Sequence, residues 1–288
     1  MRNTMKWLIF GVILSLLLAA TGISVPIVSA AAWQEKVDPL VLSSSVDGET
    51  EFLVFLSEQA DLSAAATMRD KTAKGTYVYE TLTSNAETRQ KPIPRTQDAL
   101  GVSYQSFWIA NMLCVRGDIN IVQQIAQRPE VGHIYANPQV QLSLPEPDPT
   151  IDRVVPNAAS TIEWNILKIN ADDVWVEGYS GQGAVIGGQD TGYQWDHPAL
   201  INQYRGWNGT NASHDYNWFD ATGLSPEEPV DPHSHGTHTM GIMVGDDGGD
   251  HQVGVAPGAR WIGCRNMDNS GFGTPATYSA CYQWFVAP

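Results

Sequence analysis

A proline-rich segment, Pro145-Glu-Pro-Asp-Pro149, divides this sequence of 288 residues into two parts. Proline fixes its own φ angle, lacks an amide hydrogen and pushes the preceding residue towards extended backbone. Three alternating prolines therefore exclude a helix interior or a central strand, and they predict a stiff, extended connection. We expect this connection to continue to Ser160 and to contain the boundary between two folding units.

Composition predicts that most of the chain folds, and it excludes several classes of protein. The sequence is 43% hydrophobic and 16% charged, with 26 Gly and 17 Pro, which does not fit disorder, collagen or a coiled coil. The net charge of -15 argues against nucleic acid or an anionic membrane surface as the main partner. The 3 Cys residues are too few for a disulfide scaffold, and their wide spacing fits no zinc ribbon.

The N-terminal sequence has the pattern of a signal peptide. An apolar run from Trp7 to Ala20 follows Arg2 and Lys6, and it is shorter than the roughly 20 residues that a membrane-spanning helix needs. The small residues of Val28-Ser29-Ala30 fit a cleavage site. We therefore expect residues 1–31 to be a signal peptide and the protein to be secreted and extracellular. An uncleaved N-terminal anchor is the alternative.

The first unit, residues 32–150, is predicted to be a small α+β unit. We expect strands over 51–56, 104–115 and 131–144, and helices that begin at Asp61 and Asp118. The first of these strands has apolar residues on both faces. The order strand, helix, strand, helix, strand predicts an open sheet with helices on one face, of ferredoxin-like type. No convergent set of catalytic side chains appears in this unit.

The second unit, residues 151–288, contains the residues that suggest chemistry. An apolar strand, Gly183-Ala-Val-Ile186, leads to Asp190, and a helix is predicted to open at His235. Such βα alternation is typical of a parallel sheet, and an acid at the carboxyl end of a buried strand lies where α/β sheets place reactive groups. If Asp190 accepts from one ring nitrogen of His235, the other can act as a general base towards a hydroxyl nucleophile.

Three motifs in this unit carry a resemblance to a known family. They are Asp190-Thr-Gly, the helix opening His235-Gly-Thr-His-Thr, and Gly254-Val-Ala-Pro-Gly-Ala259. In this order they resemble the subtilisin-type (S8) serine endopeptidases, and the stretch from Trp261 to Pro288 resembles the bacillopeptidase F-like branch. The resemblance implies an α/β parallel-sheet catalytic domain, preceded by an inhibitory propeptide of I9 type over 32–150.

The resemblance also assigns roles to particular residues. Asp190 and His235 correspond to two members of the catalytic triad, and His238 corresponds to a structural histidine of the family motif. Ser270, Gly271, Phe272 and Gly273 match the segment that pairs with a substrate strand. The implied partners are protein or peptide substrates and the chain's own propeptide as an intramolecular inhibitor, with a monomer expected and no nucleic acid.

The sequence also departs from the family pattern. It contains no Gly-Thr-Ser-Met-Ala segment with the nucleophilic serine, and the asparagine-bearing stretch that supplies the oxyanion donor is missing. We therefore expect a C-terminally truncated chain, inactive as a fragment. Its catalytic part holds only the N-terminal half of a family domain.

The cysteines and the acidic loops leave two questions open. Cys264 and Cys281 are the natural disulfide pair, with two buried thiols as the alternative and Cys114 left over. No cofactor is required by the proposed chemistry. Calcium is a possible ligand of the loop Asp246-Asp247-Gly-Gly-Asp250, although such a loop is more often a solvated turn. Ala199 stands where calcium-binding family members carry an aspartate.

Two other functions remain as alternatives. His233-Ser-His235-Gly-Thr-His238 has the spacing of a metallo-β-lactamase-type zinc site, but that motif places an aspartate where Thr237 stands. A non-catalytic, secreted binding or inhibitory remnant of a protease would explain the missing serine. The intact Asp190 and His235 motifs favour the secreted endopeptidase precursor, with cleavage between Leu144 and Glu163.

Overall fold

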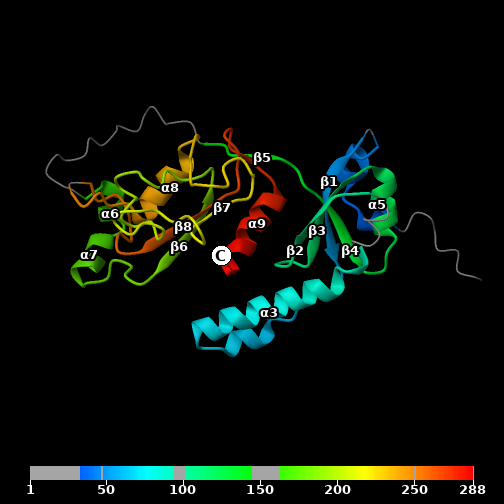
Figure 1. The fold of residues 1–288 in the computed structure, drawn as a ribbon, viewed down its shortest axis with the longest axis horizontal. Coiled ribbons are helices and arrows are strands. Elements are labelled where there is room, and N and C mark those ends of the chain that lie inside the picture. The colour runs from blue at the N-terminus through cyan, green and yellow to red at the C-terminus, as the bar shows by residue number, and fades with distance from the viewer. Residues whose placement is uncertain (1–32, 47, 94–100, 145–161, 250, 288) are drawn as a thin grey trace, which may run out of the picture.

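The computed structural model describes residues 33–46, 48–93, 101–144, 162–249 and 251–287. These residues form two units, and helix α9 (Pro275–Val286) of the second unit lies between the two sheets (Figure 1). The predicted signal peptide and the predicted proline-rich connection lie outside the described residues. No helix in the described part of the chain has the length and apolar character needed to span a membrane.

The first unit is a four-stranded antiparallel sheet with the strand order β2-β3-β1-β4. Its elements are η1 (Gln34–Lys36), α2 (Pro39–Ser44), β1 (Thr50–Leu56), η2 (Ser63–Thr67), α3 (Lys71–Arg89), β2 (Tyr104–Phe107), β3 (Met112–Gly117), α5 (Ile119–Ala126) and β4 (Val131–Ala136). The order of the main elements, β1-α3-β2-β3-α5-β4, is of the expected ferredoxin-like type, but it contains four strands where three were predicted. Helix α5 begins at the predicted residue, because the Asp118 carboxylate accepts hydrogen bonds from the amides of Asn120 and Ile121, at 2.9 and 3.0 Å.

Three predictions for the first unit were wrong in detail. The strand expected over 104–115 is a hairpin, β2–β3, whose turn contains Asn111 with φ 40°. The strand expected over 131–144 ends at Ala136, and β5 (Val140–Gln141) follows as a separate strand. The helix expected at Asp61 begins as the short η2, and the polar stretch after it forms α3, which buries only Leu82 and Ala86. A helix with so little apolar surface gives no periodic signal.

The sheet of the first unit is covered on both faces. Phe52, Val54 and Leu56 of β1 pack in a core with α2 and α5. Leu53 belongs to a second cluster that includes Ala276 and Ala280 of α9. The apolar residues on both faces of this strand therefore serve two interfaces, one within the unit and one with the second unit.

The second unit contains a parallel sheet with the order β6-β8-β7, as expected for an α/β fold. Its elements are α6 (Trp164–Lys168), α7 (Ala171–Val176), β6 (Val185–Asp190), β7 (Trp218–Asp220), α8 (His235–Val244), β8 (Arg260–Arg265), β9 (Phe272–Gly273) and α9. Strand β6 was expected to be buried, but it is an edge strand in the described part of the chain, and Val185 is 48% exposed. The carboxyl end of β6 is buried, because Gly188 and Asp190 face the core beneath α8.

A disulfide bond joins Cys264 of β8 to Cys281 of α9, with a Cα–Cα distance of 5.7 Å. Both cysteines are fully buried. Helix α9 also packs on the sheet through Phe285 over Gly187 and Trp284 over Phe219. The helix that lies between the two units is therefore fixed to the strands of the second unit.

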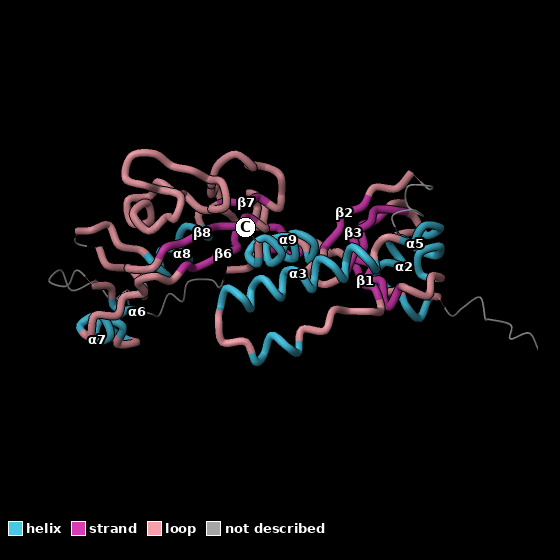
Figure 2. The backbone as a smooth tube through the Cα atoms, turned by 60° about the horizontal axis from the view of Figure 1, so that its bottom comes forward, coloured by secondary structure: helices cyan, strands magenta, loops and turns pink. Residues whose placement is uncertain are grey.

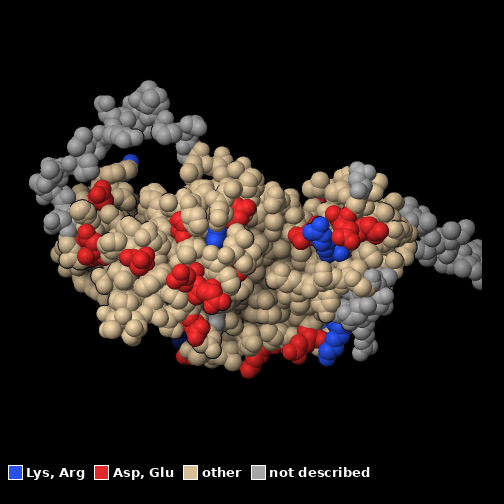
Figure 3. All heavy atoms as spheres, turned by 45° about the horizontal axis from the view of Figure 1, so that its top comes forward, with Lys and Arg blue, Asp and Glu red and all other residues tan. Residues whose placement is uncertain are grey.

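Segments from the two units pair directly. Strand β5 of the first unit runs antiparallel to β9, with Val140 opposite Gly273 and Gln141 opposite Phe272. The tube in Figure 2 shows α9 beside the sheet of the first unit, where the amides of Trp108 and Ile109 donate to Gln283 Oε1 at 2.7 and 3.4 Å. Figure 3 shows carboxylates spread over the face that it displays, with few basic side chains among them. The first unit thus contacts the second through the β5–β9 strand pair and through helix α9.

Candidate active site

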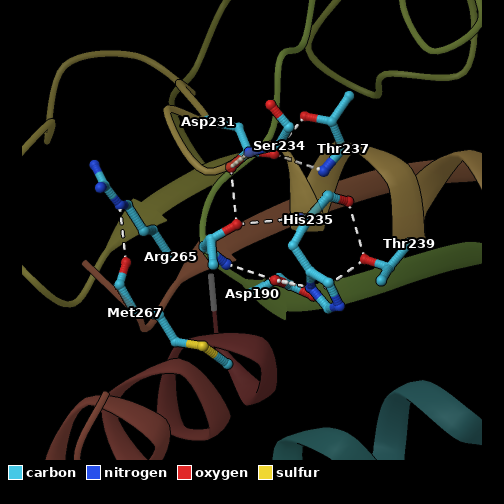
Figure 4. Close-up of polar contacts among 10 residues, drawn as sticks. Asp190, Asp231, Ser234, His235, Thr237, Thr239, Arg265 and Met267 are labelled. Atoms are coloured by element: carbon cyan, nitrogen blue, oxygen red, sulfur yellow. Dashed lines mark hydrogen bonds and ion pairs between the residues drawn. The ribbon is translucent and has the colours of Figure 1, made fainter. Parts of the chain in front are cut away.

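An aspartate and a histidine meet at the carboxyl end of the parallel sheet. Asp190 is the last residue of β6 and His235 the first of α8, and His235 Nδ1 lies 2.7 Å from Asp190 Oδ1 (Figure 4). The amide of Thr191 donates to Asp190 Oδ1 at 2.7 Å, and Thr239 Oγ1 donates to Oδ2 at 3.1 Å. The carboxylate is therefore held by three donors and accepts the Nδ1 proton of the ring.

This geometry leaves the second ring nitrogen of His235 available. No residue in the described part of the chain bonds to Nε2, and the side chain is 21% exposed against 10% for Asp190. A carboxylate on Nδ1 fixes the tautomer, so the lone pair on Nε2 can take a proton from a hydroxyl nucleophile. The structure thus brings together the two residues that the sequence analysis selected, His235 as the general base and Asp190 as the carboxylate that orients it.

Asp231 organises the start of helix α8, and the sequence analysis missed it. Its carboxylate accepts four hydrogen bonds: from Thr191 Oγ1 at 2.8 Å, Ser234 N at 3.0 Å, Thr237 N at 2.8 Å and Thr237 Oγ1 at 2.6 Å. Figure 4 shows Asp231 above the contact of His235 with Asp190. Since Thr191 follows Asp190 directly, one carboxylate links the turn after β6 to the helix that carries His235. An acidic residue just before a helix was the available signal.

Two glycines permit the close approach of this turn and this helix. A Cβ on Gly236 would lie 2.0 Å from the carbonyl oxygen of Gly192 and 2.9 Å from Asp190 Cβ. Gly192 itself has φ +125°, and a Cβ there would lie 1.9 Å from the carbonyl oxygen of Val230. A side chain at Gly236 would push the start of α8 away from Asp190, and one at Gly192 would push the turn after β6 away from Val230.

The substrate-pairing segment predicted at Ser270 to Gly273 forms a loop and the short strand β9. Asp268 shapes the loop, because its carboxylate accepts from the amides of Ser270 and Phe272 at 2.8 and 2.9 Å. Strand β5 pairs with this edge, and the amide of Leu142 donates to the carbonyl oxygen of Gly271 at 2.8 Å. The edge therefore binds an extended chain in the present structure.

Arg265 supports the same loop from the sheet, and the sequence analysis missed it too. It lies opposite Asp190 in the β6–β8 register and its side chain is buried. Its guanidinium donates to the carbonyl oxygen of Met267 at 3.0 Å and to Asn269 Oδ1 (Figure 4). A rigid guanidinium with two neutral acceptors holds the chain between β8 and β9 in one conformation.

His238 lies apart from the Asp190–His235 pair. It lines a cavity of about 730 Å³ together with His197, Asp231 and Trp164, and His235 is not part of that lining. Within the described residues, no three His, Cys, Asp or Glu side chains come together as metal ligands. The zinc alternative therefore has no support from the placement of its three histidines.

The acidic loop considered for calcium forms turns in the described residues, whereas Asp250 lies outside them. The Asp246 carboxylate accepts from Gly248 N at 2.8 Å, and that of Asp247 accepts from Gly249 N at 2.9 Å. The hydrogen bond from Gly249 is the main cause of a lowered pKa of Asp247. Ala199, where an aspartate was considered, is buried. Calcium binding stays a prediction.

Comparison with known proteins gives concordant matches. Residues 181–287 match the subtilase family model, peptidase S8. Bacillopeptidase F of Bacillus subtilis is 32% identical over 286 residues, which cover 90% of this chain and 20% of that protein. Proprotein convertase subtilisin/kexin type 4 of Rattus norvegicus is 35% identical over 107 residues, which cover 37% of this chain and 14% of that protein.

Among solved structures, the epidermin leader peptide processing serine protease of Staphylococcus aureus superposes with a TM-score of 0.47 and 14% identity, covering 78% of this chain and 44% of that one. The chain spans only 20% of the length of bacillopeptidase F.

Proposed function

We propose that this chain is part of a secreted serine endopeptidase precursor that hydrolyses peptide bonds in proteins, because residues 181–287 match the subtilase family model. The observation that carries the proposal is the 2.7 Å contact of His235 Nδ1 with Asp190 Oδ1, with Nε2 left unbonded in the described part of the chain. This is the acid–base half of a Ser-His-Asp triad. The nucleophilic serine is not found in a family motif within the 288 residues.

The proposed reaction assigns one step to each residue. His235 Nε2 takes the proton of the serine hydroxyl as its oxygen attacks the substrate carbonyl carbon, and it then gives that proton to the leaving amine. Asp190 orients the ring and stabilises the imidazolium. Backbone amides and an asparagine outside these 288 residues would stabilise the oxyanion. Without its serine the chain is expected to be inactive.

We also propose that residues 32–150 act as an inhibitory propeptide. Support comes from the antiparallel pairing of β5 with β9, which puts an extended segment of the first unit on the edge assigned to substrate. The contacts of Trp108 and Ile109 with Gln283 and the packing of Leu53 near α9 hold the first unit in place. Cleavage between Leu144 and Glu163 would leave this unit bound until it is displaced or degraded.

Secretion is part of the same proposal. The N-terminal pattern of residues 1–31 supports it, and so does the disulfide Cys264–Cys281, because such bonds persist in oxidising compartments outside the cytosol. N-terminal sequencing of the secreted product would test both cuts: one is expected near Ala30 or Ala31, and one between Leu144 and Glu163.

The test of the activity compares two proteins. The 288-residue chain should not hydrolyse a fluorogenic peptide, whereas the product of the coding sequence continued beyond codon 288 should do so through a Gly-Thr-Ser segment. In that longer protein Asp190→Asn should lower kcat by about 10⁴-fold, the order of magnitude known for the corresponding aspartate of subtilisin itself. A genuine stop after codon 288, or full activity in Asp190→Asn, would refute the proposal and favour a non-catalytic binding protein.

A further inference from the structure

His233 stands where the catalytic pair meets the substrate edge. Its ring centroid lies 6.3 Å from that of His235, in an edge-to-face arrangement. On its other side, His233 Nε2 lies 3.2 Å from the point that a Cβ on Gly271 would occupy. Leu142 Cβ lies 3.3 Å from the same point. The ring therefore borders the acid–base pair, the edge and the strand that lies on the edge.

The backbone before helix α8 fixes this position. Ser234, the N-cap residue, has a left-handed φ of 71°, and its amide donates to Asp231 Oδ1 at 3.0 Å. A non-glycine residue holds this conformation only when its surroundings impose it. The turn that carries His233 is thus pinned by the same carboxylate that anchors the helix of His235.

Both ring nitrogens of His233 lack a partner in the described part of the chain. Nδ1 is buried without a hydrogen bond, and no described residue bonds to Nε2. Buried polar nitrogens are nearly always bonded, so an orphaned imidazole beside a binding edge indicates a missing partner. The histidine lies at the place where the side chains of a bound strand pass.

The carboxylates on the elements that neighbour His233 are bonded to other groups. Asp190 bonds to His235, Asp231 accepts its four hydrogen bonds from the start of α8, and Asp268 accepts from two amides of the loop before β9. No carboxylate of the described residues lies within 4.0 Å of the His233 ring. Among the residues that the structure describes, His235 is the one histidine whose ring contacts that of His233. A charged imidazole here would have no counter-ion of its own.

The register identifies which residue of a bound strand faces His233. Because Gln141 lies opposite Phe272, Leu142 lies opposite Gly271, and residues directly opposite each other project to the same face of a sheet. Leu142 is half-buried, whereas Gln141 and Ser143 on either side of it are exposed. Because Gly271 has no side chain, no side chain at this position separates Leu142 from the His233 imidazole.

We propose that His233 is a specificity-determining residue that favours aspartate or glutamate at the substrate position that Leu142 occupies here. The proposal rests on the proposed function, since it takes the β9 edge as the substrate edge. A carboxylate at this position can accept a hydrogen bond from the ring and, when the imidazole is protonated, form an ion pair with it. Strand β5 presents a leucine at this position and lacks this interaction, so acidic substrates would compete with it better than neutral ones.

The test places the carboxylate on the chain itself and measures how firmly β5 lies on β9. Leu142→Glu and its matched control Leu142→Gln lose the same apolar contact and differ only in charge. The amide of residue 142 donates to Gly271, so its hydrogen exchange reports the separation of the two strands. At pH 5.5 the Glu variant should show about two- to fivefold greater protection than the Gln variant, as expected for a solvent-accessible ion pair.

This difference should vanish at pH 8.5, where an imidazole is neutral, and in a His233→Gln background at pH 5.5. Equal protection of the two variants at pH 5.5, or a difference that persists in His233→Gln, would overturn the proposal. Exchange measures strand docking and not turnover, so the outcome does not depend on whether the chain belongs to an active peptidase.

A second measurement uses the unchanged chain, in case both substitutions prevent docking. Peptides that copy residues 140–144, with Glu or Gln in place of Leu142, are added at pH 5.5. The Glu peptide should lower the protection of the Leu142 amide more than the Gln peptide does. An equal effect of the two peptides would also overturn the proposal.

Discussion

The carboxylate of Asp231 offers the sharpest test of how the site is held together. Asp231→Ala removes the acceptor of four hydrogen bonds at once, two from backbone amides of the first turn of α8 and two from the hydroxyls of Thr191 and Thr237. Loss of a helix cap costs about 1 kcal/mol, and loss of a favourable charge at a helix N-terminus costs about 0.5 kcal/mol. Loss of the hydrogen bond from each of the two hydroxyls costs about 1 kcal/mol, and the cost is smaller where water replaces the carboxylate.

Together these terms predict that Asp231→Ala lowers the free energy of unfolding by about 3 kcal/mol, because bonds to one carboxylate are not additive. Asp231→Asn keeps one acceptor oxygen and should lose about half of that. The assay is urea unfolding at pH 7, followed by tryptophan fluorescence. The control is Asp196→Ala, since this exposed aspartate makes no hydrogen bond in the described part of the chain, and it should change the free energy by no more than about 0.5 kcal/mol. If Asp231→Ala falls within the range of this control, the carboxylate does not organise the helix start.

Three further predictions concern the interface, the disulfide and a half-buried histidine. Gln283→Ala removes the acceptor of the Trp108 and Ile109 amides and should raise the hydrogen-exchange rate of these amides by about tenfold. Gln283→Glu keeps an acceptor oxygen and should leave the rate unchanged. Equal exchange rates in the two variants would contradict the role of Gln283 as the acceptor. Replacing Cys264 and Cys281, which are 17 residues apart, by serine should lower stability to urea by about 3 kcal/mol, and a loss below about 1 kcal/mol would show that the crosslink is dispensable. Burial lowers the pKa of His214, so the unfolded state binds more protons and stability should fall as pH drops below about 6.5; a His214→Gln variant with the same pH profile would show that this group is not responsible.

The sequence by itself selected the two residues that are proposed to carry the chemistry of the second unit. Asp190 could be placed at the end of a strand and His235 at the start of a helix from local patterns, and the parallel α/β arrangement followed from their alternation. The helix of the first unit at Asp118 was equally visible, because its cap is a local signal. These features depend on neighbours within a few residues, which a sequence shows directly.

The errors in the first unit have a common cause. Helix α3 buries only Leu82 and Ala86, so it carries no amphipathic period. The strand expected over 131–144 divides because β5 pairs with β9, more than a hundred residues further along the chain, and not with its own sheet. Local propensity cannot show which partner strand a segment will find.

Tertiary structure alone decided which residues surround the Asp190–His235 pair. Asp231, Arg265 and His233 have no family motif in their own right here, and their roles follow from contacts between β6, α8 and the chain around β9. The sequence determined the reactive groups, because a strand end and a helix start position them locally. Folding determined the distances between these groups, because hydrogen bonds and packing between separate elements set them.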